Sequence, residues 1–225
     1  ANWNGTVPQV TYTTTTGSSS TLGITVTPIN DPSVLVADTA TTAEDTPVSG
    51  NVLSNDGDVD NALTVASFTV AGVTGSFAAG QTATITGIGT LLINANGSYT
   101  FTPAANWNGS VPQVTYTTNT GSSSALGITV TPVNDPSVLV ADTATTAEDT
   151  PVSGNVLSND GDVDNTLTVA SFTVAGVTGS FTAGQTATIT GVGSLVLNAD
   201  GSYTFTPAAN WNGTVPQVTY TTTTG

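Results

Sequence analysis

The sequence predicts an all-β protein built from tandem β-sandwich domains, and three observations support this prediction. First, its 225 residues include 48 Thr, 27 Val and 7 Ile, which suit a pleated, half-buried surface and lose side-chain freedom in a helix. Second, nearly the whole sequence repeats at a fixed interval. Third, short alternating strand patterns are separated by Gly, Pro and Asn, and no helix-like pattern appears.

The repeat has a period of 104 residues, and residues 1–121 match residues 105–225 at 108 of 121 positions. A unit of this length can bury its own core, unlike the roughly 20–50-residue units of a solenoid. We therefore expect independent domains joined in a row. Residues 1–31 would be the last strands of one repeat, 32–135 a complete sandwich, and 136–225 a sandwich lacking its last strand.

Alternation of apolar and polar residues locates individual strands. Leu126, Ile128 and Val130 alternate with small or polar residues, which predicts a strand with one buried face. Residues 90–102 predict a hairpin around the dipeptide Asn-Gly at 96–97. This dipeptide is typical of a type I′ turn, in which both central residues need positive φ.

Further strand signals complete the repeat. One strand is expected to begin at Val114 and another at Val52-Leu53. In the segment 63–70 the apolar alternation slips at Ala66-Ser67, which indicates a β-bulge or a change of sheet. About seven strands per repeat without helix signals indicate an immunoglobulin-like sandwich.

Composition excludes several classes of function. The chain has 15 Asp and Glu and no Lys, Arg, His or Cys, so its formal net charge is −15. Nucleic-acid binding through phosphate neutralisation is therefore excluded, as are disulfides, thiolate or imidazole metal sites and Ser-His-Asp catalysis. No apolar run reaches the ~18 residues of a membrane-spanning helix, so we expect no direct membrane insertion.

Three acids fall within five residues: Asp56, Asp58 and Asp60. Two like charges ~4 Å apart repel by about 4 kcal/mol at an effective dielectric of ~20, and this chain has no cationic side chain nearby to offset the repulsion. Either these carboxylates spread into water or an external cation neutralises them. Ligands that are all oxygen match Ca²⁺, whereas Mg²⁺ demands tighter octahedral geometry. Asp38, by contrast, is isolated and is expected to face solvent.

Other acids extend this pattern along the repeat. The order is Asn-Asp-Pro at 30–32, Glu-Asp-Thr-Pro at 44–47 and then the Asp-x-Asp run, and it resembles the calcium-binding segments of cadherin repeats. The strings DTATTAEDTPVSGNVLSNDGDVDNALTV, LLINANGSYTFTPAANWNG and ITVTPVNDP resemble the bacterial cadherin-like, VCBS-type repeats of giant secreted adhesins. This resemblance covers the whole repeat. It implies calcium-stiffened extender domains in RTX-type adhesins, exported by type I secretion and held at the cell surface.

The same resemblance implies the calcium ligands. It assigns Asn30 and Asp31 to a linker site and Glu44 to the site at the top of the domain. The linker is shorter than in cadherins and an Asp-Arg-Glu motif is missing, so the number of ions per junction stays open. The complete implied set is Asn30, Asp31, Glu44, Asp45, Asp56, Asp58, Asp60, Asn134, Asp135, Glu148, Asp149, Asp160, Asp162 and Asp164.

We expect a mechanical function, in which extracellular extender repeats hold a distal adhesive domain away from the bacterial cell. The expected partners are neighbouring repeats, in the same chain or head to tail. One alternative is a module that binds a glycan or another ligand through its Trp or Thr surface, although Trp3, Trp107 and Trp211 more simply close the ends of the sandwiches. Another is a subunit of an extracellular filament or surface layer. An active site copied into every near-identical repeat is implausible, so no enzymatic activity is expected.

The two ends of the sequence are the same string, because residues 1–17 and 209–225 are identical. With no initiator Met and no signal peptide, we expect a segment of something longer. The second sandwich should lack the strand that corresponds to Leu22, Ile24 and Val26, leaving an apolar groove and an open edge. Two routes fit: the segment is a window on a continuous array, which we favour, or separate chains join head to tail by strand addition.

Overall fold

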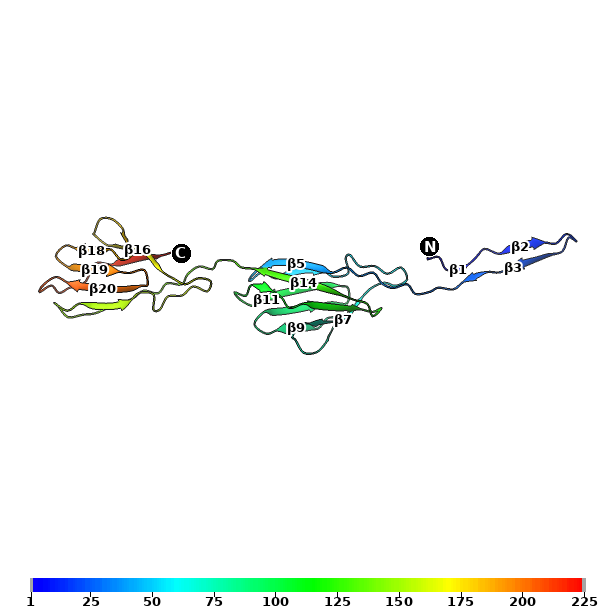
Figure 1. Ribbon diagram of the computed structural model, residues 1–225, viewed down its shortest axis with the longest axis horizontal. Helices are drawn as coiled ribbons and strands as arrows, with labels where there is room; N and C mark the ends of the chain where they lie inside the picture. Colours follow the sequence, from blue (N-terminus) through cyan, green and yellow to red (C-terminus); the bar gives the residue numbers. More distant parts are fainter. Residues whose placement is uncertain (1, 224–225) are drawn as a thin grey trace. The chain divides into compact units, whose positions relative to one another are not determined.

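The computed structural model describes residues 2–223 as strands joined by turns and loops (Figure 1). The chain divides into two compact units, one ending at Val133 and the other beginning at Asn134. The described residues contain no helix, and therefore none long and apolar enough to cross a membrane. The prediction of an all-β protein is confirmed.

The first repeat folds into a sandwich of two sheets, whose strands lie between residues 38 and 131. Its strands are β5 (Asp38–Ala43), β6 (Val48–Asn51), β7 (Val65–Val70), β8 (Phe77–Ala78), β9 (Thr82–Ile85), β10 (Gly89–Ile93), β11 (Ser98–Pro103), β12 (Gly109–Ser110), β13 (Val114–Thr118) and β14 (Ser123–Thr131). One sheet has the order β6-β11-β10-β9 and the other the order β12-β14-β13-β7-β8. β5 joins the second sheet by pairing parallel to β14, and Figure 1 shows the two strands alongside each other.

The core of this repeat lies between the two sheets. Phe68, Tyr116 and Leu126 project from one sheet and Leu91 and Phe101 from the other, and all five are 0% exposed. Burial of each large apolar side chain contributes roughly 1.5–3 kcal/mol. The alternating apolar positions therefore account for the closure of this sequence into a sandwich.

Several predicted strands are confirmed. The apolar stripe of residues 126–130 lies in β14, and β13 begins at Val114. The slip in the alternation is a β-bulge, because Thr117 pairs with Ser67 while Thr118 pairs with Val65, leaving Ala66 without an opposite residue. The hairpin of β10 and β11 also forms as predicted.

Two local predictions are wrong. The turn of the hairpin is not type I′, because only Gly97 of the Asn-Gly dipeptide has positive φ, at 83°. The Gly97 N–H donates to the carbonyl of Asn94 at 2.9 Å, as in a type I turn followed by a left-handed glycine. The strand expected at Val52-Leu53 lies earlier, since β6 ends one residue before Val52.

Residues 134–223 form the second unit with fewer strands. They are β15 (Val152–Asn155), β16 (Val169–Val174), β17 (Phe181–Thr182), β18 (Thr186–Ile189), β19 (Gly193–Leu197), β20 (Ser202–Pro207) and β21 (Val218–Thr222). The sheets have the orders β15-β20-β19-β18 and β17-β16-β21. Within these described residues no strand corresponds to β14, and residues 142–147, the counterpart of β5, are not paired as a strand.

Residues 2–29 carry four short strands, drawn in blue in Figure 1. β1 (Gly5–Thr6) pairs with β4 (Thr25–Val26), and β2 (Val10–Thr13) pairs with β3 (Ser19–Leu22). Among the described residues these two sheets share no strand with either sandwich. They repeat the pairing of β12, β13 and β14 without a second sheet to cover them.

Candidate metal centre

The residues that precede the first sandwich are hydrogen-bonded to its Asp-x-Asp loop. The Asp31 N–H donates to Asp60 Oδ2 at 2.6 Å, and Asn61 Nδ2 donates to Asn30 Oδ1 at 2.8 Å. These four residues and Asp58 lie together at the start of the repeat and are called here the amino-terminal cluster. None of the five is buried.

Asp58 organises the loop that carries the cluster. Its Oδ1 accepts the N–H groups of Asp60 and Asn61 at 2.9 and 2.7 Å, and its Oδ2 accepts the Ser33 hydroxyl at 2.7 Å. These hydrogen bonds, the one from Ser33 above all, lower the pKa of Asp58. The carboxylate is therefore ionised and fixes the path of the loop.

Asp56 points toward the core instead. Its Oδ1 accepts the Val36 N–H at 2.8 Å and its Oδ2 accepts the Tyr116 hydroxyl at 2.7 Å. The same hydroxyl lies 3.4 Å from Asp38 Oδ2. The expectation that Asp38 faces solvent is wrong, because it is half-buried, and burial together with the negative charge of Asp56 raises its pKa. Asp56 thus links the loop to the core.

The second unit reproduces this arrangement with its own residues. The contacts are Asp135 N to Asp164 Oδ2 at 2.7 Å, Asn165 Nδ2 to Asn134 Oδ1 at 2.8 Å, Ser137 Oγ to Asp162 Oδ2 at 2.7 Å, and Tyr220 Oη to Asp160 Oδ2 at 2.6 Å. Both units therefore begin with a pair of connecting residues hydrogen-bonded to an Asp-x-Asp loop.

Glu44 lies at the opposite end of β5 from Asp38. At about 3.3 Å per extended residue the separation is roughly 20 Å, so the structure does not bring Glu44 together with the amino-terminal cluster. Glu44 is 3% exposed and accepts hydrogen bonds from the Val133 N–H and from Asn108 Nδ2. Its counterpart Glu148 is exposed.

Asp45 has a role in the local backbone. It adopts a φ of 58°, a left-handed conformation that Asp tolerates better than most residues. Its Oδ1 accepts the N–H of Asn106 at 2.9 Å, and Asp149 makes the same contact with Asn210 at 2.7 Å. This acid thus joins two loops at the end of each sandwich.

The donor chemistry of the amino-terminal cluster fits a hard cation. In the described part of the chain no three or more Asp or Glu side chains are grouped as a complete metal site. Calcium takes about 6–8 oxygens, however, including amide and backbone oxygens and water. A carboxylate offers about four lone-pair sites, so Asp58 and Asp60 can accept their hydrogen bonds and still bind an ion. The cluster therefore fits as part of a coordination shell.

Sequence reasoning did not identify Tyr116, Ser33 and Asn61 as partners of these acids. An inward-facing Tyr on a strand is a usable signal for Tyr116, because a buried phenol needs a hydrogen-bond partner. Ser33 follows the connecting residues directly, and Asn61 extends the Asp-x-Asp run by one position. The position of each polar residue, close to an acidic residue in the sequence, is the signal that could have identified Ser33 and Asn61 as partners.

The tryptophans of the two sandwiches pack against their cores. Trp107 contacts the first core, and Trp211 contacts the second, where it lies edge-on to Phe205 with ring centroids 6.4 Å apart. Trp3, in the uncovered amino-terminal segment, is 57% exposed. These contacts favour a packing role and give no support to glycan binding through the Trp residues.

Comparison with known proteins identifies the family. The family model described as bacterial cadherin-like domain matches residues 30–132 and again residues 134–225. The chain is therefore a tandem of cadherin-like β-sandwich repeats and belongs to the bacterial cadherin-like domain family. A search of curated protein sequences gave no significant match.

Several solved structures resemble the chain at low sequence identity. The extracellular cadherin domains 1–5 of protocadherin gamma B2 match with 13% identity and a TM-score of 0.43, over 93% of this chain and 46% of that one. The human desmocollin-1 ectodomain matches with 11% identity and a TM-score of 0.34, over 94% and 40%. Domains 4–9 of the surface layer protein SbsC match with 15% identity and a TM-score of 0.32, over 92% and 33%. The chain spans less than half the length of each.

Proposed function

We propose that these repeats are calcium-stiffened extenders of a bacterial cell-surface adhesin, which project a distal binding domain away from the cell. Membership of the bacterial cadherin-like family supports an extracellular adhesive or structural role. Cadherin-like domains of this kind are typically non-catalytic and often bind calcium. The role of the repeats in this proposal is mechanical.

The observation that carries the proposal is the attachment of the connecting residues to the acidic loop. In each unit the two residues that precede the sandwich are hydrogen-bonded to the Asp-x-Asp loop, Asp31 to Asp60 and Asp135 to Asp164. An ion bound at this loop would therefore also restrain the chain just before the sandwich. Restraint at that point is what an extender requires in order to stay straight.

Four residues would hold the ion in the first repeat: Asn30, Asp31, Asp58 and Asp60. Asp56 is assigned a structural role, because it turns toward the core, where its Oδ2 accepts the hydroxyl of the buried Tyr116. Bound Ca²⁺ would supply the positive charge that the chain does not contain, because Lys and Arg are absent. Neutralisation would relieve repulsion among carboxylates that no cationic side chain offsets.

The decisive experiment removes charge from the cluster while keeping its hydrogen bonds. Asn can replace Asp60 and Asp164 and still accept an N–H through its amide oxygen, so the double variant D60N/D164N should fold. The matched control is Asp200→Asn, because Asp200 lies outside the cluster and its counterpart in the first repeat is already Asn96.

Calorimetry should show calcium binding by the unaltered chain and by the control, and binding at least tenfold weaker in the double variant. With Ca²⁺ at ~1,000 times its Kd, each site should add about 4 kcal/mol to the free energy of unfolding. Chelation should lower the melting temperature and shorten the maximum dimension in small-angle X-ray scattering. The proposal fails if calcium gives no heat of binding and leaves both the melting temperature and the maximum dimension unchanged.

A further inference from the structure

Most strand edges of the first sandwich are protected against pairing with another chain. β5 is bounded by Asp38 at one end and by Glu44 and Asp45 at the other, and β6 directly follows Pro47. β8 and β12 have only two residues each. Charged side chains, Pro and very short strands are three devices by which proteins prevent edge-to-edge pairing. These four strands therefore offer little to a partner strand.

β9 has none of these protections. The segment 82–86 reads Thr-Ala-Thr-Ile-Thr, and residues 61–134 contain no charged residue at all. The second repeat has the same segment at 186–190, in β18. In the part of the chain that the structure describes, β9 pairs only with β10 and β18 only with β19. Both repeats therefore present an uncharged strand edge whose outward backbone N–H and C=O groups have no strand partner.

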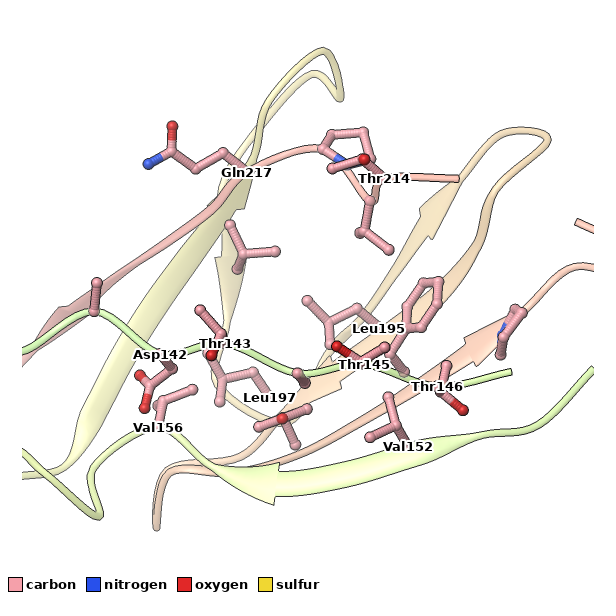
Figure 2. A pocket seen from close by; sticks show the side chains of 18 of the residues that line it. Asp142, Thr143, Thr145, Thr146, Val152, Val156, Leu195, Leu197, Thr214 and Gln217 are labelled. Carbon is pink, nitrogen blue, oxygen red and sulfur yellow. The ribbon is translucent and has the colours of Figure 1, made fainter. Parts of the chain in front are cut away.

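The side chains of this edge alternate between the core and solvent. In β9, Ala83 and Ile85 are buried, whereas Thr84 between them is exposed. Figure 2 shows the inner side of the corresponding sheet in the second unit, where Leu195 and Leu197 of β19 line an apolar pocket. The Thr side chains lie on the opposite, outer face. Pairing along the edge would therefore extend the sheet and leave the core unchanged.

We propose that β9 of one copy of this protein pairs antiparallel with β9 of a second copy, and β18 with β18, so that the repeats associate side by side. The edge segment reads almost the same in both directions. In an antiparallel pair centred on Thr84, that residue lies opposite its own copy, and Thr82 lies opposite Thr86. Ala83 then lies opposite Ile85, a small side chain against a large one. Thr pairs on the outer face are favourable cross-strand pairs.

The distribution of charge favours a second copy as the partner at this edge. With a net charge of −15, two copies repel each other wherever their acids come close, and the edge lies in a segment that carries none. A row of unpaired backbone groups binds an extended strand, and the same edge of another copy is such a strand. The interface is isologous, because both copies use the same residues. Four residues make a small interface, so the association should be weak and depend on protein concentration.

Like charges placed opposite each other should break the pairing. Thr84→Glu combined with Thr188→Glu puts two carboxylates together at the centre of each paired edge, and sedimentation of the chain with both repeats should show association at least about tenfold weaker. The matched control is Thr102→Glu with Thr206→Glu. These two residues are also exposed and lie in the same cross-strand rows, two strands from the edge. The control should associate like the unaltered chain.

A mixture of two variants identifies the partner. Thr84→Lys with Thr188→Lys should also prevent self-association, but opposite charges facing each other are favourable, so the Lys and Glu chains should associate with each other in equal amounts. This result would also show that both variants are folded.

The proposal is overturned if the unaltered chain does not associate at any concentration, if the Glu variant associates as strongly as the control, or if the mixture stays unassociated. A partner strand from a different protein would give the first of these results. The edge residues lie outside the amino-terminal cluster, so calorimetry should show unchanged calcium binding by the Glu variant. Failure of the pairing and failure of the calcium proposal are therefore distinguishable.

Discussion

The hydroxyl of Tyr116 donates a hydrogen bond of 2.7 Å to Asp56 Oδ2, across 60 positions of sequence. Tyr116 is 0% exposed, and its hydroxyl oxygen also lies 3.0 Å from the carbonyl oxygen of Val52. Burial, reinforced by the negative charge of Asp56, raises the pKa of the phenol. The acidic loop is thus anchored to the hydrophobic core independently of any cation.

This anchor predicts a specific loss of stability. Tyr116→Phe leaves the Asp56 carboxylate without its buried donor, which should lower the free energy of unfolding by about 1–3 kcal/mol. The control is Tyr12→Phe, because Tyr12 occupies the same place in the preceding repeat and is 51% exposed. Its effect should stay within about 0.5 kcal/mol. Urea denaturation compares the two, and equal effects would refute the anchoring role.

The raised pKa of Asp38 predicts a dependence of stability on pH. Because burial and Asp56 raise this pKa above 3.8 in the folded state, folding favours the protonated carboxyl. The unaltered protein should therefore lose stability as the pH rises from about 3.8 through the raised pKa. Asp38→Asn removes this loss, so the melting temperature of the variant relative to the unaltered protein should increase over the same range.

The pKa of Asp200 is shifted in the opposite direction from that of Asp38 and predicts the opposite dependence of stability on pH. The hydroxyl of Ser202 lowers the pKa of Asp200 below its ordinary value, so ionisation favours the folded state and stability should rise as the pH increases through this range. Asp200→Asn should therefore be less stable than the unaltered protein near neutral pH, and this difference in stability should shrink as the pH falls. Calorimetric melts from pH 2 to 7 in a chelator measure both variants, and parallel curves for the two would contradict the assigned causes.

The repeating strands could be predicted because their signals are local. The bulge at Ala66 is visible as a slip in the apolar alternation, and the stripe of Leu126, Ile128 and Val130 is a regular period of two. The turn type at Asn96-Gly97 could not be read in the same way. The dipeptide fits two kinds of turn, and the pairing of the flanking strands, in register up to Ile93 and Tyr99, selects between them.

The candidate site was only partly predictable, because its contacts are remote in sequence. The acidic residues were identifiable by type and clustering. Which acid has which role depends on folding. Folding brings Tyr116 to Asp56 and to Asp38 across 60 and 78 positions of sequence. Composition alone cannot show that one member of an Asp-x-Asp run turns inward while the next one organises the loop.

The close approach of Gly50 to Tyr99 gives a steric prediction. A Cβ at residue 50 would lie 2.6 Å from the Tyr99 hydroxyl and 2.8 Å from ring atoms, and Tyr99 is 6% exposed. Gly50→Ala should therefore cost about 1–3 kcal/mol of unfolding free energy through overpacking. The strand glycine Gly127 is the control, because its nearest neighbour would be 3.8 Å away. A denaturation midpoint for Gly50→Ala equal to that of Gly127→Ala would show that the ring moves freely.

Glu44 and Glu148 are the same residue in a complete and an incomplete repeat. Glu44 accepts hydrogen bonds from the Val133 N–H and Asn108 Nδ2 while 3% exposed, so Glu44→Gln should lower the free energy of unfolding by about 1.5–3 kcal/mol. Glu148 is exposed, and Glu148→Gln should change the free energy of unfolding by no more than about 0.5 kcal/mol.

A self-complemented chain, in which the sequence of residues 18–31 follows residue 225, should remove this difference. Residue 29 corresponds to Val133, so in the self-complemented chain the appended copy of Ile29 would bring an N–H to Glu148. Glu148→Gln should then become as destabilising as Glu44→Gln, because a carboxylate buried with its donors loses a charge-assisted hydrogen bond when neutralised. Urea denaturation of the original and the self-complemented chain, each with and without Glu148→Gln, measures the change. If Glu148→Gln stays neutral in the self-complemented chain, the added strand does not reproduce the packing of β14, because a correctly placed strand must deliver that N–H to the carboxylate.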